Sequence, residues 1–244
     1  MGMIAPEPTP TAASSRALVV SAEPQCLVGL TVVLRGAGYV VESAPAGRDA
    51  LALVAEDPPD VLLLDLGLRD GEGVELCAGA RRLSAVPILI LLPVGAQREI
   101  VRALNAGADD YLAKPFRGQE LLDRLRGLVA PTSAGLRVSS PLEVGELVID
   151  LARRRVSRAG AVLLLDPAEF EVVRVLAQHR GRVVTDRRLL RAVWGDQRGE
   201  ETHCLRVTFA CLRAKLESDP WRPDYLIAEP GLGYRLRAPG EVVG

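Results

Sequence analysis

Short apolar runs alternate with amphipathic stretches over the first half of the chain. The apolar runs predict strands at 17–21, 39–44, 60–65, 87–92 and 109–113. Apolar residues at helical spacing predict helices at 24–36, 47–56, 72–83, 96–106 and 117–129. Because the strands are almost continuously apolar, we expect a doubly wound parallel sheet with helices on both faces. The functional site of such a sheet lies at the carboxyl ends of its strands.

The pattern changes after residues 131–141, which are rich in small and polar residues and which we interpret as a linker. Short β patterns follow at 143–150, 153–158 and 161–165, and helical patterns at 167–179, 185–193 and 201–217. A hairpin around Pro-Gly-Leu-Gly is expected at 225–237. This is the order of a winged helix-turn-helix, whose third helix enters the major groove of DNA. We therefore predict a disordered tail at 1–16, an α/β domain at 17–130 and a winged-helix domain at 142–238.

The composition is that of a soluble globular protein, with 48% apolar and 25% charged residues. The apolar runs are too short to span a membrane, and the first residues lack an export signal, so we expect a cytoplasmic protein. The four cysteines show no spacing typical of zinc ligands or disulfides. Residues 1–130 hold 12 basic and 16 acidic side chains, whereas residues 131–244 hold 18 and 15. The basic second half permits nucleic-acid binding.

Four motifs span the two halves of the chain: DVLLLDLGLRDGEGVEL, NAGADDYLAKPF, ETHCLRVTFACLRAKLESDPWRP and YLIAEPGLGYRL. On these motifs both halves resemble the OmpR/PhoB family of response regulators, and its KdpE-like branch in particular. The resemblance implies a five-stranded, flavodoxin-like receiver domain followed by a winged-helix DNA-binding domain. It also implies that Asp65 is the phosphoacceptor, Lys114 the lysine that senses the phosphoryl group, and Tyr111 the switch aromatic.

The chain departs from the family at the expected receiver pocket. The family carries two adjacent acids that hold Mg²⁺ where this chain has Ser21 and Ala22, and Glu23 is the one acid left beside them. Mg²⁺ requires hard oxygen ligands, so we expect its binding to be lost or weak, and no other metal or cofactor is indicated. Leu92 stands where the family places a hydroxyl that contacts the phosphoryl group. The chain thus resembles the atypical members that lack the acidic pair.

Without a metal, Asp65 needs another counter-charge, and a direct ion pair with Lys114 is the natural one. Such a pair could hold the receiver near an active-like state, or the pocket could be a relic that only packs. The less charged pocket is also expected to suit a small-molecule effector, which would bind there in place of a phosphoryl group. The alternative is a conventional two-component regulator, phosphorylated on Asp65 by a sensor kinase.

The helix predicted at 201–217 has an inward stripe formed by Leu205, Phe209, Leu212 and Leu216. The remaining faces carry the candidate DNA contacts. Matching the family motif implies a phosphate contact for Arg213, groove contacts for Thr208 and Cys211, and a minor-groove role for Arg235 in the hairpin. Arg206 lies off the inward stripe, and His203 is either a phosphate contact or a surface residue of the first turn. Double-stranded promoter DNA is the expected partner.

The family dimerises through its fourth helix, fifth strand and fifth helix, so the resemblance implies a homodimer. The matching residues are Asp109, Asp110, Glu120 and Arg124, with Ile100 where a basic partner for Glu120 is common.

RNA polymerase is a further candidate partner, whereas the altered pocket argues against a sensor kinase. We find no nucleophile and base in the α/β domain that would indicate an enzyme, since both histidines fall outside it. A protein-binding module without DNA binding is opposed by Arg213 and Arg235.

Overall fold

The structure is a computed structural model that describes residues 15–67, 72–129, 141–195, 202–238 and 241. It divides into two compact units, one comprising Met1–Val94 and Tyr111–Val129 and the other Gly95–Asp110 and Ala130–Gly244. The predicted tail lies outside the described residues except for its last two positions, and so does the predicted linker except for Pro141. No helix in the described part of the chain is long and apolar enough to cross a membrane.

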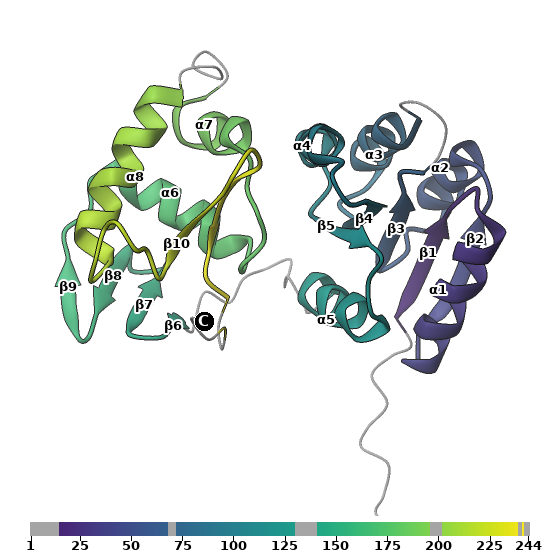
Figure 1. The fold of residues 1–244 in the computed structure, drawn as a ribbon, viewed down its shortest axis with the longest axis horizontal. Coiled ribbons are helices and arrows are strands. Elements are labelled where there is room, and N and C mark those ends of the chain that lie inside the picture. The colour runs from purple at the N-terminus through teal and green to yellow at the C-terminus, as the bar shows by residue number, and fades with distance from the viewer. Residues whose placement is uncertain (1–14, 68–71, 130–140, 196–201, 239–240, 242–244) are drawn as a thin grey trace, which may run out of the picture. The chain divides into compact units, whose positions relative to one another are not determined.

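The first half of the chain forms a five-stranded sheet in the order β2-β1-β3-β4-β5 (Figure 1). The strands are β1 (Arg16–Val20), β2 (Val40–Ala44), β3 (Val61–Asp65), β4 (Ile88–Pro93) and β5 (Asp110–Lys114). The pairings of β1 with β2, β1 with β3 and β3 with β4 are parallel. Every residue of β3 is buried, as expected for a strand covered on both faces. The predicted doubly wound parallel sheet is therefore confirmed.

Helices follow the strands in the expected alternation. They are α1 (Pro24–Gly36), α2 (Gly47–Glu56), α3 (Glu72–Leu83), α4 (Gln97–Ala106) and α5 (Gly118–Val129). Leu30 and Leu34 of α1 and Leu121 and Leu125 of α5 join one apolar cluster with the sheet residues Val19 and Leu63. This cluster holds the two helices against one face of the sheet, and it thereby fixes the strand ends that carry the candidate pocket.

The second half begins with an antiparallel sheet of four strands in the order β6-β7-β8-β9. They are β6 (Leu142–Val144), β7 (Leu147–Asp150), β8 (Arg155–Arg158) and β9 (Ala161–Leu163). The continuous β pattern predicted at 143–150 is two strands instead, because the chain turns at Gly145 with a φ of 57°. Glycine adopts this left-handed backbone without the steric penalty of a side chain.

Three helices and a hairpin complete the chain, as predicted. They are α6 (Pro167–Gln178), α7 (Asp186–Trp194), α8 (Thr202–Leu216), β10 (Leu226–Glu229) and β11 (Gly233–Leu236). Helix α6 begins with a capping box, in which Asp166 and Glu169 each accept the other's backbone N–H. Lys215 of α8 donates to the same Glu169 carboxylate at 2.6 Å, which ties α8 to the start of α6. The winged helix-turn-helix order is thereby confirmed.

The turn of the hairpin depends on a glycine. Gly233 has a φ of 146°, and a Cβ atom placed there would lie 2.2 Å from the carbonyl oxygen of Val184. The close approach allows Val184 and Tyr234 to exchange backbone hydrogen bonds of 2.8 and 2.9 Å. The ring of Tyr234 in turn stacks on Phe209 of α8, with ring centres 3.7 Å apart. The hairpin is thus fixed to both α8 and the segment before α7.

Candidate functional site

The candidate pocket lies where β1, β3 and β5 end. Asp65 is the last residue of β3 and is only 1% exposed, and Ser21 follows the last residue of β1 and is fully buried. Val20 pairs with Leu64 in the parallel ladder. The residues that follow them, Ser21 and Asp65, therefore lie side by side. Lys114 ends β5 and is followed by a cis peptide bond to Pro115.

The carboxylate of Asp65 accepts hydrogen bonds on both oxygens. Ser21 Oγ and Lys114 Nζ each donate to Oδ2 at 2.7 Å, and the backbone N–H of Gly67 donates to Oδ1 at 3.1 Å. Ser21 Oγ also accepts the backbone N–H of Glu23 at 3.1 Å, so its hydroxyl is oriented toward Asp65. The expected ion pair between Asp65 and Lys114 is therefore present, and Ser21 completes it.

The electrostatics of the pair favour its charged form. Burial alone would raise the pKa of Asp65, but the hydrogen bonds from Lys114, Ser21 and Gly67 outweigh it, and the pKa is lowered. Burial likewise opposes the charge of Lys114, yet the contact with Asp65 raises its pKa. Burial also raises the pKa of the nearby Cys26 thiol, which the adjacent Asp65 charge reinforces. At neutral pH the pocket thus holds a carboxylate, an ammonium group and a neutral thiol.

The expected inward stripe of α8 is confirmed, because Leu205, Phe209, Leu212 and Leu216 are all buried. His203, Arg206 and Cys211 are exposed on the remaining faces. Thr208 is partly buried, and its hydroxyl donates to the carbonyl of Cys204 at 2.9 Å within the helix. The exposed face of α8 therefore carries one arginine, one histidine and one thiol, a combination able to contact phosphates and base edges.

Two family models match different parts of the chain. The response regulator receiver domain model matches residues 17–126, and the model of the transcriptional regulatory protein C terminus matches 160–236. The transcriptional regulatory protein KdpE of Mycobacterium tuberculosis is 42% identical over 222 residues, 91% of this chain and 98% of its own. The KDP operon transcriptional regulatory protein KdpE of Escherichia coli is 39% identical over 219 residues, 90% and 97% of the two chains. The chain belongs to the OmpR/PhoB family of response regulators.

A further relative is the DNA-binding response regulator MtrA of Mycolicibacterium smegmatis, 36% identical over 224 residues, 92% of this chain and 97% of its own. The crystal structure of DrrB, an OmpR/PhoB homolog from Thermotoga maritima, is 27% identical and covers 92% of this chain and all of that one, with a TM-score of 0.47. Both halves of the chain match, in family order, so this OmpR/PhoB protein is a DNA-binding transcription regulator.

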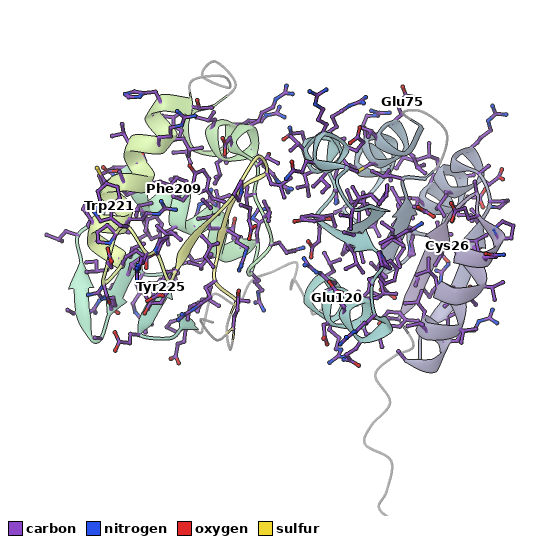
Figure 2. The ribbon with its side chains drawn as sticks, in the orientation of Figure 1. Cys26, Glu75, Glu120, Phe209, Trp221 and Tyr225 are labelled. Atoms are coloured by element: carbon purple, nitrogen blue, oxygen red, sulfur yellow. The ribbon has the colours of Figure 1, made fainter. Side chains whose placement is uncertain are left out.

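The OmpR/PhoB family implies a Mg²⁺ ion beside Asp65, and the donor set of this pocket does not fit one. Carboxylate oxygens of Glu23 and Asp65 and the sulfur of Cys26 lie within 4.8 Å of one another (Figure 2 labels Cys26). Mg²⁺ demands near-octahedral oxygen ligands, whereas sulfur is a soft donor and Ala22 supplies no ligand. Lys114 Nζ also lies 4.0 Å from Glu23 and 2.7 Å from Asp65, where its positive charge opposes a cation.

The other receiver residues implied by the OmpR/PhoB resemblance are placed as follows. Leu92 lies one position beyond Leu91, the residue that pairs with Asp65, and its side chain is buried. Tyr111 of β5 is partly buried, with the guanidinium of Arg124 at 5.9 Å from its ring centre. Leu92 thus offers no polar group at the end of β4.

The predicted dimer-face residues differ in their exposure. Glu120 is exposed and Asp109 and Arg124 are half-buried, whereas Asp110 and Ile100 are buried (Figure 2 labels Glu120 on α5). Ile100 lies at helical spacing from the buried Ala103 and Leu104 of α4, so it belongs to the inward side of that helix. A dimer face on these elements stays a prediction, and the buried Ile100 is not available to it as an exposed apolar contact.

Two arginines expected at DNA have structural partners in this chain. Arg213 donates to the carbonyl of Leu226 at 2.9 Å and so joins α8 to β10. Arg235 is 19% exposed, donates to Glu229 at 2.7 Å and forms a bidentate pair with Glu241 at 2.9 and 3.0 Å. Insertion of Arg235 into a minor groove would break all three bonds, so fastening β11 to β10 is the role that its contacts favour.

Sequence reasoning assigned Cys26 no role in the receiver pocket and therefore missed it. Its position three residues after Glu23, in the first turn of α1, was the available signal, because one helical turn brings these residues to the same end of the helix. Gly67 was also missed. Its backbone N–H donates to Asp65, and a Cβ there would lie 3.3 Å from Oδ1.

Proposed function

We propose that this OmpR/PhoB regulator acts in the cytoplasm as a homodimer on promoter DNA without conventional phosphorylation of Asp65. The observation that supports this most is the occupied carboxylate of Asp65, which accepts from Ser21, Lys114 and Gly67. A phosphoacceptor must offer a carboxylate oxygen to the phosphoryl donor, and Oδ2 already accepts two hydrogen bonds. Attack through Oδ2 would require at least one of them to break, and the other oxygen, Oδ1, accepts the backbone N–H of Gly67.

The surroundings of Asp65 add two further reasons. Catalysis of phosphoryl transfer rests on positioning and on neutralising the charge of the transferred group, which the family does with Mg²⁺. Ser21 and Ala22 replace the acids of that metal site, and Leu92 replaces the hydroxyl. The ion pair of Asp65 with Lys114 supplies the counter-charge that Mg²⁺ would otherwise supply.

A small-molecule effector is the proposed signal in place of phosphate. Losing two acids and a hydroxyl leaves a less charged pocket, which suits a partly apolar ligand better than a hydrated metal. Such a ligand acts only through a difference in its affinity for two receiver states. Titration of candidate metabolites into the complex with operator DNA tests this. DNA affinity that never moves, while output follows the cellular level of the protein, argues against any effector.

The second candidate mode is conventional phosphorylation by a sensor kinase. The observation that favours it is that Asp65 and Lys114, the two residues most directly involved, are both retained at the ends of β3 and β5. The identity of 42% to KdpE of Mycobacterium tuberculosis fits this mode as well as the first. The two modes differ in one measurable property, the phosphorylation of Asp65.

The deciding experiment is incubation with acetyl phosphate and Mg²⁺, followed by intact-mass measurement. We expect no phosphoryl group on the natural chain. The variant that combines Ser21→Asp with Ala22→Asp serves as a matched positive control, because it restores both metal-binding acids and removes the Ser21 hydrogen bond. Stoichiometric labelling of the natural chain that disappears in Asp65→Ala would establish the conventional mode.

A further inference from the structure

The outermost strand of the four-stranded sheet has an open edge. β9 pairs with β8 on one side, and among the described residues no strand pairs with its other side (Figure 1). The N–H and C=O groups along an open edge are a template for a further strand, and native proteins usually protect such an edge with charged side chains. β9 carries instead the apolar sequence Ala161–Leu163, with two more leucines behind it.

Two exposed aliphatic side chains lie at this edge, one within β9 and one directly after it. Val162 is 48% exposed and Leu164 is 87% exposed, and residues two apart on an extended chain point to the same side. Leu163 between them packs against the core of the winged-helix domain. A single exposed aliphatic residue is common on protein surfaces, but a pair of them on an open strand edge is a typical site of strand addition.

A cleft of about 330 Å³ adjoins the edge. Its apolar lining includes Leu163, Leu165 and Phe170. The guanidinium of Arg154 lies 4.3 Å from the ring centre of Phe170, and Arg154 holds a left-handed backbone with a φ of 49°. The volume is at the lower end of the range of ligand pockets and is sufficient for one or two aliphatic side chains.

The charged residues that line the cleft indicate the chemistry of the segment that binds there. Arg154 and Arg155 line it, and Asp166, its acidic lining residue, is engaged at 2.8 Å by the backbone N–H of Glu169. Arg154 contacts Glu171 at 3.3 Å, but that carboxylate is shared with Arg174 at 2.6 Å. The cleft therefore favours carboxylates. Pairing of β9 with a second copy would bring two sets of these arginines together, which like-charge repulsion disfavours.

We propose that β9 and this cleft form a docking surface for an extended acidic segment of another protein. The segment adds to the open edge of β9 as a fifth strand, places an aliphatic side chain in the cleft and pairs its carboxylates with Arg154 and Arg155. The docking surface does not depend on how the receiver domain is controlled. This proposal is therefore independent of the proposed absence of phosphorylation.

The test is calorimetric titration of the full-length protein with an eight-residue peptide that alternates glutamate with valine. We expect saturable binding, and binding at least tenfold weaker for a peptide that alternates lysine with valine. Leu164→Glu should weaken binding of the acidic peptide at least tenfold. Because Leu164 is largely exposed, this change should leave the circular dichroism spectrum intact. Val28→Glu on α1 is the matched control, since Val28 is 65% exposed and should not affect binding.

Backbone amide NMR of the same full-length protein locates the peptide. Shifts centred on 154–167, with slowed amide exchange at Val162, are the expected result. The proposal is overturned if the acidic peptide shows no saturable binding up to about 1 mM, which corresponds to only about 4 kcal/mol. Equal binding of both peptides, or shifts located elsewhere, would also overturn it. Concentration-dependent dimerisation that Leu164→Glu abolishes would assign the edge to a second copy instead.

Discussion

Ser21 donates its hydroxyl hydrogen to Oδ2 of Asp65 at 2.7 Å, the same oxygen that Lys114 contacts. A carboxylate at the position of Ser21 would repel Asp65 unless a cation lay between them, whereas the hydroxyl satisfies it directly. The replacement therefore changes a site that needs a metal into one that is complete within the chain.

Removing either partner of the ion pair should destabilise the receiver domain, and removing Lys114 should cost more than removing Asp65. Lys114→Met leaves Asp65 buried without a counter-charge, and we expect a loss of about 3 kcal/mol. Asp65→Asn keeps a hydrogen-bonding group and leaves a lysine that is 26% exposed to water, so a smaller loss of about 1 kcal/mol is expected. Urea denaturation at pH 7 measures both, together with the double variant. Simple additivity of the two losses would contradict a coupled pair.

Restoring the acidic pair should create a magnesium site. Ser21→Asp combined with Ala22→Asp adds two carboxylates beside Glu23 and Asp65, so the metal-free variant should melt at a lower temperature than the natural chain. Mg²⁺ binds the folded state and reverses the loss. We expect a rise in Tm of roughly 4 °C in about 10 mM Mg²⁺, on the order of 1 kcal/mol. The natural chain should show no shift, and an equal shift in both chains would refute the poor fit to Mg²⁺.

Variants of Arg206 and Arg213 should distinguish a residue that contacts DNA from one that stabilises the fold. Arg206 is exposed, so Arg206→Ala should change the free energy of unfolding by less than about 0.5 kcal/mol while lowering the salt slope of DNA binding by about one. Arg213→Ala should destabilise by about 1 kcal/mol, because it removes the hydrogen bond to Leu226. Filter binding at several salt concentrations and denaturation of the same samples provide both numbers. An unchanged slope in Arg206→Ala would remove that residue from the DNA interface.

His179 should make the winged-helix domain sensitive to mild acid. Burial, and next the charge of Arg188, lower its pKa from 6.5 to about 4. The unfolded chain therefore binds more protons between these values, so the stability present above pH 6.5 is lost as the pH falls toward 4. The loss reaches about 3 kcal/mol. His179→Gln should flatten the decline, and identical pH profiles for variant and natural chain would exclude His179 as its source.

The sequence predicted the elements and the pocket more fully than it predicted the use of individual side chains. Apolar periodicity is sufficient to place β3 and its terminal Asp65, because a strand buried on both faces tolerates little else. The partners of Arg213 and Arg235 could not be found in this way. Leu226, Glu229 and Glu241 lie 6 to 13 residues away, and only the folded hairpin brings them within bonding distance. Periodicity also carries no information on Gly145, whose left-handed φ divides one expected strand into two.

Trp194 ends α7, and Trp221, which is 92% exposed, follows α8 (Figure 2 labels Trp221). The chain has no other tryptophan, so the whole receiver half lacks one. Selectively excited tryptophan fluorescence therefore reports on the winged-helix half alone, whereas circular dichroism reports on both halves. Denaturation curves from the two signals coincide if the halves unfold together and separate if they do not. The natural chain thus carries, without labelling, the means to measure whether a change in the receiver pocket reaches the DNA-binding half.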